Sequence, residues 1–125
     1  MREAQEQENL FTMLAYVGRK YPEAQLLFHV PNGGKRNAAE AAHLKRQGVK
    51  AGVPDLFLPV ARGGFHGLFI EMKAGKNKPT DNQKKWMEEL AKQGYAVRVC
   101  YGSKQGYESI LEYLKMKEIE ANDKF

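Results

Sequence analysis

Two short apolar segments in the middle of the chain, residues 55–60 and 67–72, flank an Arg-Gly-Gly turn at positions 62–64. Segments of this length on either side of a glycine turn are typical of a β-hairpin. Each strand carries one carboxylate, because Asp55 opens the first strand and Glu71 lies near the end of the second. A carboxylate among apolar strand residues is out of place if it faces the core, so both positions need an explanation.

A possible explanation comes from Lys73. Side chains alternate along a strand, so Glu71 and Lys73 share one face, and a hairpin can bring Asp55 beside them. Two adjacent carboxylates repel each other unless a cation lies between them or one is protonated. Oxygen ligands suit Mg²⁺ or Mn²⁺, and a neighbouring lysine can orient a water molecule and offset phosphate charge. The trio suits metal-dependent phosphodiester hydrolysis, although the spacing alone is better explained by a surface ion pair.

The rest of the chain predicts an α/β fold. Apolar periodicity and turn residues predict a helix over 3–19, a strand over 24–30, helices over 38–47 and 80–92, a strand over 95–101 and a last helix after a Ser103 cap. A helix between the second hairpin strand and the 95–101 strand implies a right-handed crossover, and therefore a mixed sheet.

Length and composition indicate one ordinary globular domain. The chain has 125 residues, of which 42% are hydrophobic and 28% charged. We expect a domain over residues 1–115 and a polar C-terminal tail over 116–125. The apolar runs are too short to span a bilayer, no signal peptide opens the chain, and the single Cys100 fits a reducing compartment. We therefore expect a cytoplasmic protein, in a bacterium or a phage-infected host cell, without membrane contact.

The charge is concentrated in the middle of the chain. The net charge is +5, but residues 35–85 alone hold eleven basic and four acidic residues, which makes this stretch +7 and the remainder −2. A basic surface attracts polyanions, nucleic acid first among them. A lysine-rich solvated face that keeps the protein soluble explains the charge equally well.

Several motifs resemble those of one nuclease family. Pro54-Asp55, the sixteen-residue step to Glu71 and the Glu71-Met72-Lys73 triplet resemble the PD-(D/E)xK nuclease signature. Further segments resemble the VRR-NUC (virus-type replication-repair nuclease) family, in its stand-alone phage and bacterial form: His29 to Arg36, Leu44-Lys45 with Gly48-Val49, Gly52 to Leu56, and Gln83 with Trp86. The motifs occur in order, and the resemblance extends from about Glu3 to about Gly102.

The resemblance implies a restriction-endonuclease-like fold, a mixed β-sheet flanked by helices, and it implies roles. Asp55 and Glu71 would hold a catalytic Mg²⁺ or Mn²⁺, with the backbone carbonyl of Met72 as a further ligand. Lys73 would position the attacking water. Gln83 matches a glutamine on the helix after the catalytic strands, although a Thr-x-x-Gln sequence is also a helix capping box.

Family members usually add an acidic residue from the first helix to the metal site. Leu10, Leu14 and Val17 define the buried face of that helix, and Glu3 projects near its centre, Glu6 near its edge. The family's Glu-x₃-Gln pattern matches Glu3 and Gln7. We therefore expect Glu3 to complete the site, with Glu6 as the second choice. Either acid is also simply favourable in the first turn of a helix.

The resemblance also implies DNA as the substrate. The expected DNA contacts are His29, Asn32, Gly33, Gly34, Lys35, Arg36, Lys45, Lys76 and Lys78. Zinc or thiol chemistry is disfavoured, because the histidines and Cys100 lack ligand spacing. The expected function is a four-way (Holliday) junction resolvase acting as a homodimer. The alternatives are a less selective flap, nick or duplex nuclease, RNA processing, and a non-catalytic DNA-binding module.

Overall fold

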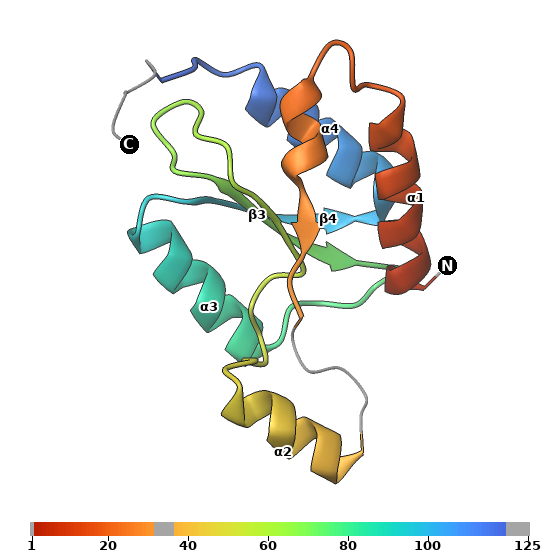
Figure 1. Ribbon diagram of the computed structural model, residues 1–125, viewed down its shortest axis with the longest axis vertical. Helices are drawn as coiled ribbons and strands as arrows, with labels where there is room; N and C mark the ends of the chain where they lie inside the picture. Colours follow the sequence, from red (N-terminus) through yellow and green to blue (C-terminus); the bar gives the residue numbers. More distant parts are fainter. Residues whose placement is uncertain (1, 32–36, 120–125) are drawn as a thin grey trace.

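The computed structural model, which describes residues 2–31 and 37–119, is a four-stranded sheet between two layers of helices (Figure 1). Along the chain the elements are α1 (Glu3–Ala15), a 3-10 helix η1 (Pro22–Leu26), β1 (Phe28–His29), α2 (Ala38–Arg46), β2 (Leu56–Leu58), β3 (Leu68–Lys73), α3 (Asp81–Lys92), β4 (Ala96–Tyr101) and α4 (Gly102–Leu114). This mixed sheet flanked by helices confirms the expected fold class.

The strand order is β1-β2-β3-β4, and the sheet mixes antiparallel and parallel pairs. β2 and β3 form the predicted antiparallel hairpin, with Phe57 opposite Phe69. β4 lies parallel to β3, with Glu71 opposite Val99, and α3 makes the crossover between them. The hairpin and the crossover are both confirmed.

The two faces of the sheet differ in what they carry. Leu56, Leu58, Leu68, Ile70 and Met72 alternate along the hairpin and point into a core that α1 and α4 cover. The opposite face has α3 over β4 and carries a stacked pair of rings, Phe57 and Phe69, with centroids 4.3 Å apart. Strand alternation places Glu71 and Lys73 on this second face, away from the leucine core.

The first part of the chain differs from the sequence prediction. The helix predicted to run to residue 19 ends at Ala15, because the carbonyl of Val17 accepts hydrogen bonds from Lys20 and Tyr21 and turns the chain. Of the strand predicted over 24–30, residues 24–26 belong to the 3-10 helix η1 and only Phe28–His29 form a strand. Ala24 and Leu27 are both buried, and residues three apart share a face in a 3-10 turn.

The start of the last helix is also different from the prediction. α4 begins at Gly102, directly after β4, and Ser103 does not cap it with its side chain. Instead, the backbone N–H of Ser103 donates to Oε2 of Glu6, at 2.7 Å. Gly102 has φ +87°, and a Cβ there would lie 2.6 Å from the same oxygen. A carboxylate from α1 therefore supplies the acceptor that the first turn of α4 needs.

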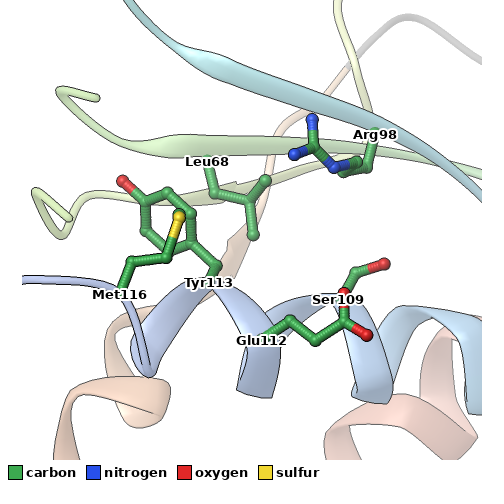
Figure 2. Close-up of a pocket in the computed structure, with 6 residues that line it drawn as sticks. All are labelled: Leu68, Arg98, Ser109, Glu112, Tyr113 and Met116. Carbon is green, nitrogen blue, oxygen red and sulfur yellow. The ribbon is translucent and has the colours of Figure 1, made fainter. Parts of the chain in front are cut away.

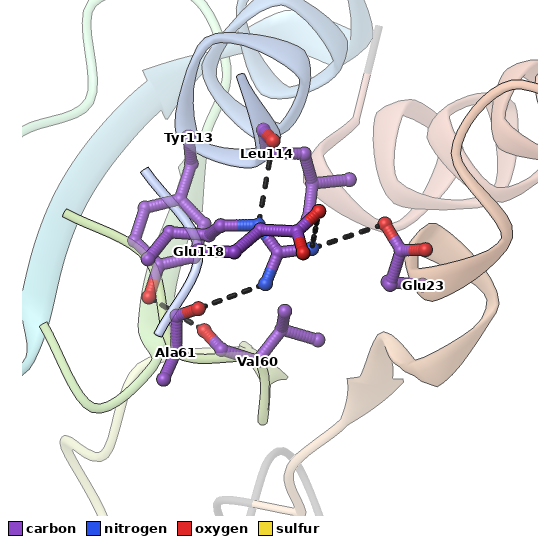
Figure 3. Close-up of polar contacts among 7 residues, drawn as sticks. Glu23, Val60, Ala61, Tyr113, Leu114 and Glu118 are labelled. Atoms are coloured by element: carbon purple, nitrogen blue, oxygen red, sulfur yellow. Dashed lines mark hydrogen bonds and ion pairs between the residues drawn. The ribbon is translucent and has the colours of Figure 1, made fainter. Parts of the chain in front are cut away.

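A buried arginine ties the hairpin turn to η1 and to the end of α4 (Figure 3). Arg62 is 7% exposed and donates to the carbonyls of Leu114 and Ala61 and to the carboxylate of Glu23, at 3.4, 2.8 and 3.2 Å. Glu118 lies 3.8 Å away on another side. Residues of the segment expected as a polar tail therefore contact the turn.

Candidate active site

Asp55 lies directly before β2, beside the ends of β1 and β3. Its Oδ2 accepts a hydrogen bond from the backbone N–H of Met72, at 2.8 Å, while its own carbonyl accepts one from Val30, at 2.7 Å. The preceding Pro54 is buried and has no N–H to offer to the sheet. The carboxylate thus replaces a backbone partner at the end of the hairpin, and this holds it against β3.

Glu71 is the most constrained charged side chain of the site. The residue is 1% exposed, and its Oε2 lies 3.7 Å from Nζ of Lys73 and 3.3 Å from Nε2 of Gln83. Its other oxygen, Oε1, is buried and has no hydrogen-bond partner among the described residues. A buried carboxylate oxygen without a hydrogen bond lowers the stability of the folded state, so its presence calls for an explanation other than stability.

The surroundings of Glu71 raise its pKa from 4.5 to about 8. The largest cause is burial, followed by the negative charge of Asp55 and by a hydrogen bond with the Asp55 carboxyl group that forms only when Glu71 is protonated. Lys73 acts in the opposite direction and lowers the pKa, and the charge of Glu3 adds to the increase. The site therefore holds more negative charge than Lys73 neutralises, and it calls for a proton or a cation.

The donor set fits a hard divalent cation. Mg²⁺ keeps several waters and commonly uses only one or two protein carboxylates, so Asp55, Glu71 and the Met72 carbonyl would suffice. The described residues contain no group of three or more His, Cys, Asp or Glu side chains arranged to hold a metal. Oε1 of Glu71, which has no hydrogen-bond partner among the described residues, is the atom best suited to bind such an ion.

The two candidate glutamates of α1 have different surroundings. Oε2 of Glu3 accepts a hydrogen bond from Nδ2 of Asn77 at 2.9 Å, and its charge reaches Glu71. Glu6 is occupied with the first turn of α4, at Ser103. Of the two, Glu3 is therefore placed to add charge to the site.

Gln83 uses both ends of its amide. Oε1 accepts from the backbone N–H of Thr80, at 2.9 Å, and the Thr80 hydroxyl accepts from the backbone N–H of Gln83, at 3.2 Å. This reciprocal pair is a capping box at the start of α3. Nε2 remains free of that box and donates to Glu71. The helix start and the site contact are thus made by one side chain.

Gln7 and His29 line the same corner. Nδ1 of His29 lies 3.1 Å from the backbone carbonyl of Asp55 and 3.2 Å from Nε2 of Gln7. The histidine contact at Asp55 joins β1 to the end of β2, and Gln7 joins α1 to β1. Both residues lie beside the carboxylate that opens the hairpin.

The expected DNA-contacting residues are spread more widely. Lys76 and Lys78 are exposed in the loop between β3 and α3, on either side of Asn77. Lys45 is exposed on α2. The remaining positions, Asn32, Gly33, Gly34, Lys35 and Arg36, lie outside the described residues.

A family model described as the VRR-NUC domain matches residues 1–104, which is most of the chain. The chain belongs to the VRR-NUC domain family. A solved structure described as a VRR_NUC domain protein is 33% identical and superposes with a TM-score of 0.78. That match covers 100% of this chain and 98% of the other. A search of curated proteins gave no match.

Membership in the VRR-NUC family makes this domain a nuclease of the PD-(D/E)xK type, with DNA as its substrate. Asp55, Glu71 and Lys73, which resemble the PD-(D/E)xK signature in the sequence, are brought together by the hairpin. Among the described residues, no helix has the length and apolar character needed to cross a membrane.

A small cavity of about 100 Å³ lies on the other side of the VRR-NUC sheet, between the strands and α4 (Figure 2). Leu68, Arg98, Ser109, Glu112, Tyr113 and Met116 line it. None of these residues belongs to the Asp55–Glu71 site.

Sequence reasoning did not identify Asn77, which holds Glu3 at the edge of the site. Its one sequence signal is its place between two lysines in a polar loop, and that pattern is too common to select it. The contact depends on the N-terminus of α1 lying beside the end of β3, which no local pattern reveals.

Proposed function

We propose that this VRR-NUC domain is a divalent-metal-dependent endodeoxyribonuclease. One observation carries the proposal: the buried Glu71 carboxylate lies beside Asp55, its Oε2 is 3.7 Å from Nζ of Lys73, and its Oε1 has no hydrogen-bond partner among the described residues. A purely structural pair of Glu71 and Lys73 would gain nothing from Asp55, which adds repulsion. A site that binds a cation gains from both carboxylates.

In this proposal, Asp55, Glu71 and the Met72 carbonyl hold Mg²⁺ or Mn²⁺, and Glu3 adds a further negative charge. The bound ion would lower the pKa of water and stabilise the charge that develops on the phosphate oxygens. Lys73, whose ammonium group lies within the site, orients the attacking water. Gln83 holds the Glu71 carboxylate in place from α3.

We further propose four-way junction DNA as the preferred substrate and a homodimer as the active species. The support is the resemblance to stand-alone family members, together with symmetry: paired cuts in a two-fold junction require two matched sites. Lys45, Lys76 and Lys78 supply positive charge for the DNA backbone, along with Lys35 and Arg36 from the 32–36 segment. The reducing cytoplasm is the expected location.

The test compares labelled four-way junction, flap, nicked and linear duplex DNA, each with Mg²⁺, Mn²⁺ or EDTA, in parallel with Asp55→Asn. Metal-dependent, paired and symmetric cuts confined to the junction are the expected result. Cutting of every substrate at similar rates would remove the junction preference and leave a general nuclease. Binding without cleavage in either metal would overturn the enzymatic proposal and favour a DNA-binding module. A parallel RNA substrate tests RNA processing.

The homodimer is tested separately by sedimentation equilibrium of the wild-type protein at micromolar concentrations. A dimer that binds one junction is expected. A monomer that still cuts both strands of a junction in a paired way would contradict the symmetry argument.

A further inference from the structure

Helix α2 stands apart from the rest of the fold. None of its side chains is buried in the described structure, and only Leu44 is half-buried. Figure 1 shows α2 beyond the sheet, at the end of the molecule where α3 begins. Such a helix adds almost nothing to the core, and its presence calls for a reason outside the domain's own packing.

The local sequence explains why α2 is helical at all. At its start, Oδ1 of Asn37 accepts from the N–H of Glu40, at 2.8 Å. At its end, the N–H groups of Gly48 and Val49 donate to the carbonyls of Lys45 and Leu44, each at 3.0 Å. This is a Schellman motif, and Gly48 takes the positive φ of 99° that it requires. The caps compensate for missing tertiary contacts, since a helix this short is marginal alone in water.

The C-terminal end of α2 and the turn that follows it are positively charged. Lys45, Arg46 and Lys50 are exposed at the C-terminal end, and Glu40 is the single acid, in the first turn. Four of the nine residues of α2 are alanines, so much of its surface lets a large partner approach closely. An exposed basic helix end with small neighbours is complementary to a polyanion.

The connection from α2 to the site is held firmly. In the segment that follows α2, the carbonyl of Ala51 accepts from Nδ2 of Asn82 on α3, at 2.8 Å. Gly52 packs so closely that a Cβ there would lie 2.9 Å from the Trp86 ring. The chain then enters the sheet at Asp55. The segment that follows α2 is therefore attached to α3, which supplies Gln83, and it leads directly to Asp55.

We propose that α2, through Lys45, Arg46 and Lys50, is a contact surface for the phosphate backbone of duplex DNA that flanks the cleaved bond. This inference rests on the proposed function, because it takes the Asp55–Glu71 site as the point where DNA is cut. Lys84 and Lys85 are also exposed, on the first half of α3. The hydrogen bond between Asn82 and Ala51 therefore joins two segments that both carry basic side chains. Flanking duplex would meet both helices.

The experiment compares Lys45→Ala/Arg46→Ala with the matched control Lys104→Ala/Lys115→Ala, which removes two exposed charges from α4 and the residue after it. Binding to linear duplex and four-way junction is measured with Ca²⁺ or EDTA over a range of salt concentrations. The α2 pair is expected to raise Kd by about tenfold near 0.1 M salt and to lower the salt slope by about two, with less than a twofold change in the control.

Other outcomes separate this inference from the proposed function. Equal changes in both pairs would overturn the role of α2 and leave the nuclease untouched. A wild-type protein that binds but does not cut, with binding weakened only by the α2 pair, would support α2 and overturn the nuclease. A shift from dimer to monomer in the α2 pair without a change in Kd would overturn the DNA contact and assign the helix to a second copy of the chain.

Protection of the α2 backbone gives a second readout that does not depend on mutation. Hydrogen exchange of the amides of residues 42–47 is expected to slow when duplex DNA is added to the wild-type protein, because a helix with few tertiary contacts opens easily when free. Unchanged exchange in α2, with slower exchange elsewhere, would contradict the proposal.

Discussion

Arg62 and Glu71 are both buried charged residues of the same hairpin, one at its turn and one near the end of β3, yet their surroundings are opposite. Arg62 has backbone carbonyls and two acidic side chains around its guanidinium group. Glu71 has one weakly paired oxygen, one oxygen without a hydrogen-bond partner in the described part of the chain, and a second carboxylate beside it. The charge of Arg62 is therefore compensated by the fold, whereas the charge of Glu71 is compensated only in part.

The difference separates a structural charge from a functional one. A buried charge whose hydrogen bonds are all made fixes the position of its neighbours, here the hairpin turn and the end of α4. A buried charge that is left partly unpaired costs stability and persists where binding compensates for it. Arg62 should therefore stabilise the fold and matter little for cleavage, whereas Glu71 should be needed for cleavage and should lower the stability of the fold where it is ionised.

The largest expected effect is on cleavage. Glu71→Gln keeps the shape of the side chain and removes its charge, so we expect cleavage to fall by on the order of a thousandfold or more, as when a group that stabilises transition-state charge is lost. Lys73→Met should reduce cleavage to a similar extent. The measurement is the single-turnover rate on junction DNA. The control is Glu108→Gln, an exposed position on α4, and a similar loss in that variant would remove the distinction.

The next effect is a pH dependence of stability. Because the pKa of Glu71 is about 8 in the folded protein and 4.5 in the reference state, the folded state binds the extra proton between these values. Stability should therefore fall as pH rises from about 4.5 to about 8, by on the order of a few kcal/mol. Urea unfolding of the wild type at pH 5 and 8 measures this.

Two additions sharpen the pH experiment. Glu71→Gln should lose this part of the pH dependence and be more stable than the wild type at pH 8. Mg²⁺ should raise Tm of the wild type more at pH 8 than at pH 5, and should have little effect on Asp55→Asn. A wild type whose stability rises steadily over this pH range would show that Glu71 is ionised without cost.

The third effect is on Arg62 and tests the other half of the comparison. Arg62→Gln should lower the free energy of unfolding by about 2 kcal/mol, because it leaves the carbonyls of Leu114 and Ala61 without their donor. Cleavage per folded molecule should be unchanged. Denaturant unfolding is compared with Arg98→Gln, an exposed arginine on β4. An equal loss of stability in Arg98→Gln would indicate a general charge effect.

The smallest expected effects distinguish the roles of Glu3 and Glu6, the two candidate glutamates of α1. Glu6→Gln should cost about 1 kcal/mol of stability, since it weakens the acceptor for the first turn of α4, and should not change cleavage. Glu3→Gln should leave stability nearly unchanged and slow cleavage by about tenfold, because it removes charge near Glu71. The reverse pattern would assign Glu6 to the site.

Sequence reasoning worked where the signal was local. The Thr80–Gln83 capping box, the alternation that puts Glu71 and Lys73 on one face, and the hairpin turn at 62–64 each depend on residues close together in the chain. These features predicted β2, β3 and α3, and they placed the proposed catalytic residues at one corner. The sequence supports two interpretations of Gln83, a capping box and a site residue, and its side chain makes the capping box as well as a contact with Glu71.

The predictions that differ from the structure depend on distant contacts. The 24–30 segment has strand-like composition, but Pro22 starts a 3-10 turn, and the burial of Ala24 and Leu27 follows from packing. Arg62 looks like a surface turn residue until Glu23, Leu114 and Glu118 are brought around it. The pKa of Glu71 likewise depends on burial, which the sequence does not record.

The two contacts of Gln83, with Thr80 and with Glu71, affect which parts of this domain can change in evolution. Its amide joins the beginning of α3 to Glu71 directly, without relying on the residues between them along the chain. The loop at 74–79 is largely exposed, and apart from the contact of Asn77 with Glu3 it carries little of that connection. Insertions beside Lys76 and Lys78 can therefore accumulate with little disturbance of the carboxylates, which makes this loop a natural place for new substrate preferences to evolve.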